Sequence, residues 1–246
     1  MAEFDRPSVA ARPATAAVID QGLRSYMLRV YNYMSLGLVV TGLVAYFTYA
    51  NAFSADGNLT ALGAAIYTGP LMWVIMLAPL AFVLVLSFGI TKLSVPTTQI
   101  LFWAFAAVMG LSLSSIFAVY TGGSIAKVFF ITAGTFGAMS LYGYTTKRDL
   151  TQFGSFLIMG LFGLIIASIA NIFFNSGPLG FAISILGVLV FVGLTAWDTQ
   201  KIKESYNVGF GADVLAKGAI MGALSLYLDF INLFLMLLRL FGNQRN

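Results

Sequence analysis

The sequence contains no cysteine and no histidine. The first absence excludes disulfides, thiolate zinc sites and thiol nucleophiles, and the second excludes imidazole acid–base chemistry, including Ser–His hydrolysis. Charged residues make up only 9% of the chain, against about 25% in ordinary soluble domains. With 59% hydrophobic residues in 246, there is too little polar surface to cover a water-soluble globule. The composition therefore indicates an integral membrane protein, and the small net charge of +4 indicates no nucleic-acid partner.

The long uncharged runs predict membrane-spanning helices. They are continuously apolar, as in LMWVIMLAPLAFVLVL at 71–86, whereas outer-membrane strands alternate. A spanning helix needs about 20 mostly apolar residues. Division of the runs at Gly, Pro, Asn and charged residues predicts seven spans, near 30–51, 70–91, 99–120, 125–146, 153–174, 180–202 and 218–240. The predicted fold class is an all-α integral membrane protein with one seven-helix membrane domain, 30–246.

The basic residues predict the orientation. Residues 1–29 carry four arginines and no apolar stretch typical of a signal peptide, so we expect a flexible cytoplasmic N-terminal arm. An inside N-terminus puts ten basic residues on inner segments and three on outer ones. The inner ones are Arg6, Arg12, Arg24, Arg29, Lys92, Lys147, Arg148, Lys201, Lys203 and Lys217. This bias predicts a multi-pass protein of the cell (inner) membrane with the C-terminus outside. A re-entrant last segment, with Arg239 and Arg245 inside, is the alternative.

Two of the nine acidic residues fall within predicted spans. Asp229 lies in LYLDFINLF, about 11 residues or 16 Å into the last span. Asp198, in AWDTQKIK, lies near the inner end of the sixth span. A carboxylate at the centre of a membrane helix costs about 2.5–3.5 kcal/mol, so such residues usually have a partner or a function. Asp198 has a second interpretation, an interfacial ion pair with Lys201 or Lys203, and Asp229 has a purely structural one.

Polar and small residues accompany both acids. Ser225 precedes Asp229 by four residues and Asn232 follows it by three, so all three share one helix face. Thr195 lies three residues before Asp198. Gly218 and Gly222 extend the stripe, and their small-xxx-small spacing favours close helix packing. We therefore treat Asp198 and Asp229 as candidate pH-sensing and ion-pathway residues, with Thr195, Ser225 and Asn232 as supporting polar groups.

Two strings in this region, ALSLYLDFINLFLMLLRLFG at 223–242 and AWDTQKIK at 196–203, resemble the Bax inhibitor-1 family (transmembrane Bax inhibitor motif), in its bacterial branch. The resemblance covers the whole membrane region. It implies six helices wrapped around a central hydrophobic seventh. It also implies a pH-sensitive calcium leak in which two aspartates, matching Asp198 and Asp229, share a proton and control opening. The family has a basic latch at the inner end of the second span, where this chain offers Thr91 and the candidate Lys92.

Elementary electrostatics makes the aspartate pair plausible independently of the resemblance. Two carboxyl groups close together in a low-dielectric site cannot both ionise at low cost, so they share a proton. Loss of that proton at higher pH leaves repulsion and a site for a hard cation. Calcium takes six to eight oxygens, more than two aspartates provide. We therefore expect weak, transient calcium binding at Asp198 and Asp229, with calcium as the permeant ion and no resident cofactor.

The same residues bear on other functions. An intramembrane aspartyl protease needs a GxGD context, whereas Leu226, Tyr227 and Leu228 precede Asp229, so no enzymatic activity is expected. A proton-coupled transporter remains an alternative because buried acids act as proton relays in many carriers. A non-transporting membrane regulator of a protease or of a stress or cell-death pathway is another. The expected partners are membrane lipid, the calcium ion and other membrane proteins.

Overall fold

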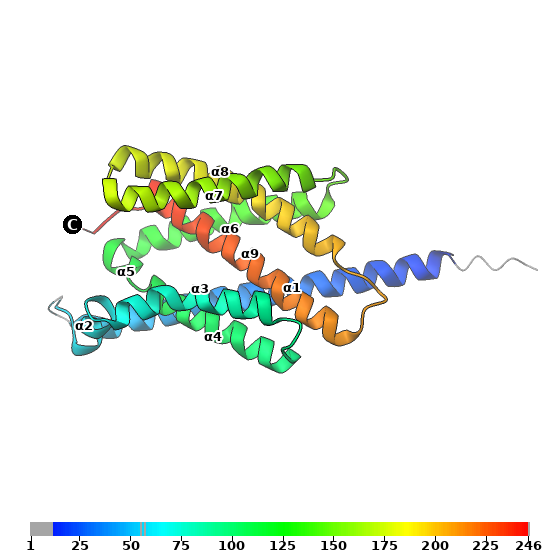
Figure 1. The fold of residues 1–246 in the computed structure, drawn as a ribbon, viewed down its shortest axis with the longest axis horizontal. Helices are drawn as coiled ribbons and strands as arrows, with labels where there is room; N and C mark the ends of the chain where they lie inside the picture. Colours follow the sequence, from blue (N-terminus) through cyan, green and yellow to red (C-terminus); the bar gives the residue numbers. More distant parts are fainter. Residues whose placement is uncertain (1–11, 55, 57, 246) are drawn as a thin grey trace, which may run out of the picture.

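The computed structural model describes residues 12–54, 56 and 58–245, with side chains described from Gln21 onward. Within these residues the chain forms nine helices, of which seven are long and apolar enough to cross a membrane, so the predicted fold class is confirmed (Figure 1). The helices are α1 (Arg12–Ala52), α2 (Ala61–Tyr67), α3 (Leu71–Gly89), α4 (Val95–Leu113), α5 (Ile116–Val119), α6 (Gly122–Thr145), α7 (Thr151–Phe174), α8 (Gly177–Glu204) and α9 (Ala212–Phe241).

Helix α9 lies at the centre of the bundle (Figure 1). In its most apolar 18-residue stretch 67% of the residues are buried, against 11% in α3 and in α7. It packs against α1, α4, α6 and α8. Ile220, Leu226, Tyr227 and Leu233 of α9 are fully buried among these neighbours. The expected arrangement, with the other membrane helices around a hydrophobic C-terminal helix, is therefore confirmed.

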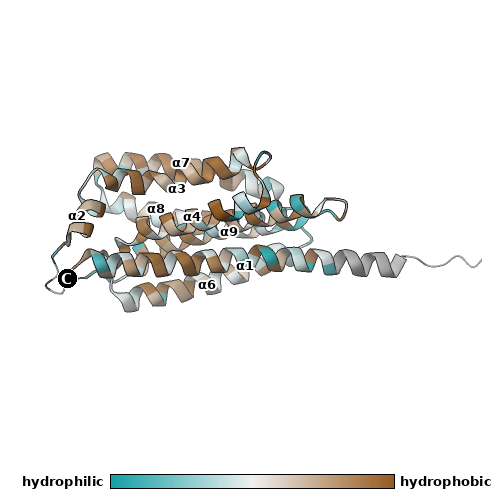
Figure 2. Ribbon diagram, turned by 90° about the horizontal axis from the view of Figure 1, so that it is seen from below, coloured by the Kyte–Doolittle hydropathy of each residue, from teal (hydrophilic) through white to brown (hydrophobic). Residues whose placement is uncertain are grey.

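The outward faces of the surrounding helices are apolar. Phe88, Ile172 and Phe173 are 81%, 76% and 83% exposed. Figure 2 shows hydrophobic residues along the middle of the helices and hydrophilic ones mainly near the ends of the bundle. In water such faces would form large apolar patches. Because the seven helices are long enough to cross a bilayer, these side chains face lipid tails instead.

Local sequence signals set the helix ends. Ser94 accepts a hydrogen bond from the Thr97 N–H and begins α4, and Ser176 does the same for the Leu179 N–H at the start of α8. Asn175 ends α7 in the left-handed conformation, at φ 47°. Hydrogen bonds from Thr151 lower the pKa of the exposed Asp149 just before α7. Each cap satisfies a backbone group that the helix itself leaves unpaired.

The helix boundaries differ from the predicted spans by a few residues, except at the N-terminus. There α1 begins at Arg12, so residues 12–29, assigned from sequence to a flexible arm, continue the first span as helix. Pro13 fits the first helical turn, and the alanine-rich segment that follows it has high helix propensity. Residues 1–11 of the expected arm lie outside the described residues. At the other end α9 is one continuous helix of 30 residues, long enough for a full span.

Helix α8 packs closely against both α6 and α7. A Cβ placed on Gly143 of α6 would lie 2.1 Å from the Ala196 carbonyl oxygen. A Cβ placed on Gly154 of α7 would lie 2.2 Å from the Trp197 ring. Only glycine therefore fits at either position. Because these contacts fix the rotation of α8 about its own axis, they also fix the direction of the next residue, Asp198.

Candidate functional site

A cavity of about 760 Å³ lies against α8 and α9, between α3 and α7. Most of its lining is aliphatic, as expected for a membrane protein, with Pro79 on the α3 side and Ile165 on the α7 side. The exceptions come mainly from the two helices at the back of the cavity. Asp198 and Lys201 project from α8, and Asp229 projects from α9. The cavity therefore brings together the two membrane acids that the sequence singled out.

Asp198 and Asp229 line the same cavity, and their carboxyl groups are close enough to interact with each other. Asp229 is only 6% exposed, and its Oδ2 has no hydrogen-bond partner among the described residues. Asp198 is half-buried, nearer the end of the bundle. A proton on one carboxyl group lets it donate to the other and spreads one negative charge over four oxygens. The geometry therefore suits a pair that holds a single shared proton.

Lys201 is the cation that interacts with this aspartate pair. It lies one turn after Asp198 on α8, lines the same cavity and attracts the Asp198 carboxylate. Its ammonium stands 4.9 Å from the centre of the Trp197 ring, which holds the flexible lysine side chain against α8. The interfacial-pair interpretation of Asp198 and the aspartate-pair interpretation are therefore compatible. Asp198 interacts with both Lys201 and Asp229.

Of the three supporting residues, two reach the cavity. Ser225 and Asn232 line it beside Asp229. The Asn232 side-chain nitrogen donates to the Leu228 carbonyl at 2.8 Å, which leaves the amide oxygen available as a ligand. Thr195 does not line the cavity; it is fully buried, and its hydroxyl donates to the Phe191 carbonyl at 2.7 Å. Threonine in a helix often bonds the carbonyl four residues back, a signal the sequence already contained.

The candidate latch Lys92 does not line the cavity that contains Asp198 and Asp229. It is exposed just beyond the end of α3, and no described residue forms an ion pair or side-chain hydrogen bond with it. The cation that contacts this loop is Lys217 of α9. Its ammonium donates to the Ile90 carbonyl at 3.1 Å and to the Leu93 carbonyl at 3.3 Å. Lys217 thus ties the α3–α4 loop to the start of the central helix.

Sequence reasoning did not find a second polar system on the other side of α8. The Tyr31 hydroxyl of α1 hydrogen bonds to Ser140 of α6 at 2.6 Å, and Ser140 bonds to Thr199 of α8 at 3.0 Å. Thr199 directly follows Asp198. These hydroxyls are too far apart in sequence for any spacing pattern to reveal their contact. They link α1, α6 and α8 at the level of the acid pair.

The donor set around the acids is small. No group of three or more Asp, Glu, His or Cys residues that could hold a metal ion occurs in the part of the chain that the structure describes. A calcium ion at Asp198 and Asp229 would need further oxygens from Ser225, Asn232, backbone carbonyls and water to reach its preferred six to eight. Such a site would bind calcium weakly and release it readily.

Comparisons with known proteins agree with the sequence-based resemblance. The family model for "Inhibitor of apoptosis-promoting Bax1" matches residues 23–246. The chain is 50% identical to the inner membrane protein YbhL of Escherichia coli over 230 residues, 91% of this chain and 94% of that protein. It is 49% identical to a protein of Rickettsia prowazekii over 227 residues, 92% and 93% of the two chains. A protein of Caulobacter vibrioides is 45% identical over the full length of both.

Proposed function

Because the chain belongs to the Bax inhibitor-1 family of membrane proteins, we propose that it is a pH-sensitive calcium leak channel of the cell (inner) membrane. The observation that carries the proposal is the pairing of Asp198 and Asp229 in one cavity, with the Asp229 Oδ2 buried and unpartnered among the described residues. In this proposal the shared proton keeps the pair compact and the pathway closed. The same proposal keeps the N-terminus in the cytoplasm.

The direction of the pH response follows from the charges. Raising the pH removes the shared proton and leaves two carboxylates facing each other in a low-dielectric site. Their repulsion favours separation of α8 from α9, and the two charges together with Ser225 and Asn232 attract a hard cation. Leak should therefore rise with pH. Weak, transient binding suits permeation because an ion must leave the site as easily as it enters.

The test of this proposal is calcium flux into liposomes that contain the purified protein. We expect calcium entry that rises steeply with pH and is absent from protein-free liposomes. A proton-coupled transporter would instead show flux that depends on an imposed proton gradient at constant pH on the calcium side. A non-transporting regulator would show no flux at any pH. Either result would contradict the channel proposal.

Lys201, which lines the cavity that contains both acids (the acid cavity), and the candidate latch Lys92, which does not, should differ in their effect on leak. Lys201→Gln removes the cation that attracts Asp198, so opening should move to higher pH. Because Lys201 is exposed, the shift should stay below about 0.7 pH unit, the equivalent of about 1 kcal/mol. Lys92→Gln, which removes the same charge at an exposed site, should change leak by less than about twofold. Both variants are measured in the same liposome assay. Full opening by Lys92→Gln would show that Lys92 is the latch.

A further inference from the structure

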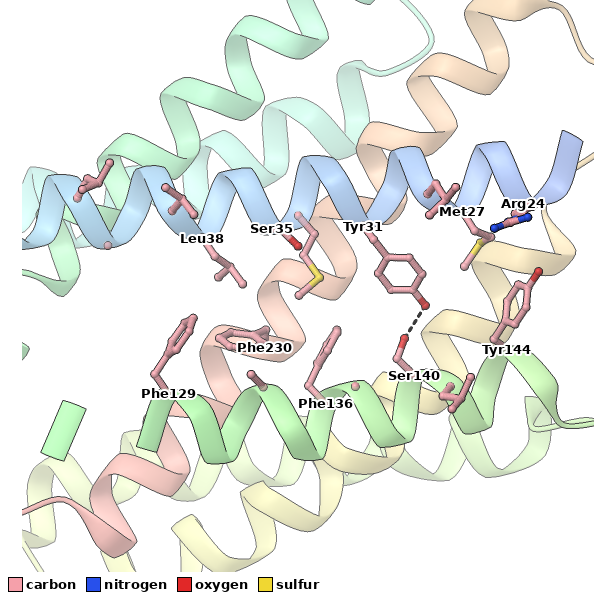
Figure 3. A pocket seen from close by; sticks show the side chains of 18 residues that line it. Arg24, Met27, Tyr31, Ser35, Leu38, Phe129, Phe136, Ser140, Tyr144 and Phe230 are labelled. Atoms are coloured by element: carbon pink, nitrogen blue, oxygen red, sulfur yellow. Dashed lines mark hydrogen bonds between the residues drawn. The ribbon is translucent and has the colours of Figure 1, made fainter. Parts of the chain in front are cut away.

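An apolar groove of about 1040 Å³ lies between α1 and α6. Both helices pack on α9 and have little direct contact with each other, so a gap remains along their length. Phe230 of α9 lies at the back of the gap, and Phe129 and Phe136 of α6 pack against it with ring centres 5.4 and 5.5 Å away (Figure 3). The groove is separate from the acid cavity, with which it shares no residue.

The groove opens toward the surrounding bilayer. Leu28 and Val39 on the α1 side are 52% and 55% exposed, and Leu141 on the α6 side is 64% exposed. From Arg24 to Leu43 the groove follows α1 for 20 residues, or about 30 Å. That length is close to the thickness of the hydrocarbon core of a bilayer, about 30 Å. An acyl chain of one leaflet therefore fits within the half of the groove nearest Arg24.

The charged side chain of the lining and most of its polar ones lie toward that end. Arg24 is the one charged residue among the described residues that line the groove, and Figure 3 shows it beside Tyr144. Lys203 adds a second cation: its ammonium donates to the Tyr144 carbonyl at 2.8 Å and stands 5.6 Å from the centre of the Tyr144 ring. The Tyr31 and Ser140 hydroxyls, joined by their 2.6 Å bond, follow further along (Figure 3). Along the groove, the positive charge is followed by hydroxyls and then by aromatic rings. This order matches an anionic phospholipid from its headgroup to its tail.

We propose that the groove between α1 and α6 binds an anionic phospholipid, with its phosphate at Arg24 and one acyl chain against Phe136 and Phe230. The apolar wall cannot select one lipid over another, because lipid tails elsewhere in the bilayer are equally apolar. Selection comes from the headgroup: arginine and phosphate form charge-assisted hydrogen bonds, and lysine contributes as a point charge. The site should therefore distinguish lipids by headgroup charge.

The cysteine-free chain allows a direct test in lipid vesicles. A single cysteine is introduced by Leu141→Cys at the rim of the groove, or by Phe156→Cys on α7 as the control; both native side chains are 64% exposed, and Phe156 lines no described cavity. Each cysteine carries a fluorophore. Quenching by chain-brominated phosphatidylglycerol is compared with quenching by chain-brominated phosphatidylcholine. At the groove, we expect phosphatidylglycerol to be preferred over phosphatidylcholine about fivefold, the equivalent of about 1 kcal/mol. At the control position, the two lipids should quench about equally.

Matched variants separate the headgroup from the groove. Arg24→Gln should reduce the preference at the groove to below about twofold, whereas Arg29→Gln, an exposed arginine of α1 outside the groove, should leave it unchanged. Gly137→Leu should exclude the acyl chain and lower quenching at the groove, since no atom lies within 4 Å of a Cβ at that position. Gly163→Leu on α7 is equally unobstructed and lies outside both cavities, so it should have no effect.

Three results would overturn the proposal. Equal preference at the groove and at the control would mean that the anionic lipid is not bound there. An unchanged preference in Arg24→Gln would remove the assigned headgroup contact. Weak quenching by both lipids at the groove, with normal quenching at the control, would mean that a second copy of the chain or another protein covers the groove.

Discussion

Asp229→Asn is expected to remove the steep dependence of calcium leak on pH. In the wild type, opening follows loss of the proton shared with Asp198, and release of one proton can change a population by up to about tenfold per pH unit. The amide introduced at position 229 keeps its hydrogens at every pH and can donate to Asp198 permanently, so the pair can no longer be split by titration. Leak should vary by less than about twofold over the pH range in which the wild type responds.

Two controls make this result specific to the pair. Asp198→Asn should have much the same effect, because it leaves Asp229 without a titrating partner. Asp149→Asn changes an exposed acid at the start of α7 and should leave the pH profile intact, since asparagine caps a helix as well as aspartate does. If either membrane-acid variant keeps the wild-type profile, proton sharing is not what controls opening.

Composition and periodicity were sufficient for most of the fold. A span of about 20 apolar residues can satisfy its backbone inside a bilayer only as a helix, so the run lengths predicted the number of membrane-spanning helices, though not the short helices α2 and α5. The N-terminal boundary of the first helix was harder to predict, because residues 12–29 are polar enough to lie outside the membrane and yet are helical. The central place of α9 came from the family resemblance. Its apolar content alone does not distinguish it from α3 or α7, which have higher hydropathy but face lipid.

The candidate site was predictable only in part. Asp198 and Asp229 stood out because burying a charged side chain in the membrane costs free energy. That cost can be recognised from one residue and its position in a span. That they share a cavity with Ser225 depends on how α8 and α9 are rotated relative to each other, which no pattern within either helix records. The groove at Arg24 was invisible for the same reason. A gap between two helices that are distant in sequence leaves no trace in either helix.

Rotation of α8 depends on glycines that the sequence could not rank. The chain has 25 glycines, and they look alike in sequence. At Gly42, Gly137 and Gly163 no atom lies within 4 Å of the position that a Cβ would occupy, so those positions tolerate larger residues. At Gly143 the same carbon would lie 2.1 Å from the Ala196 oxygen and 2.9 Å from the Ala196 carbonyl carbon. Both are backbone atoms, which cannot move aside as a flexible side chain can.

Gly143→Ala is therefore expected to destabilise the protein severely, although alanine is the better helix former by about 1 kcal/mol. The added methyl group must push α6 away from α8. That separation would break the 3.0 Å bond between Ser140 and Thr199 and the 2.8 Å bond from Lys203 to the Tyr144 carbonyl. Overpacking in a rigid core costs about 1–3 kcal/mol or more. At the upper figure, the melting temperature in detergent should fall by about 6–12 °C.

Gly137→Ala is the matched control for this experiment, because it adds the same methyl group to the same helix six residues earlier, where space is open. Its melting temperature should equal that of the wild type or rise slightly. Both variants are heated in detergent, and the folded fraction is measured by size-exclusion chromatography. A wild-type melting temperature for Gly143→Ala would mean that α6 and α8 are further apart than the structure places them. In that case Gly143 would not fix the direction of Asp198, and the geometry of the acid pair would need another support.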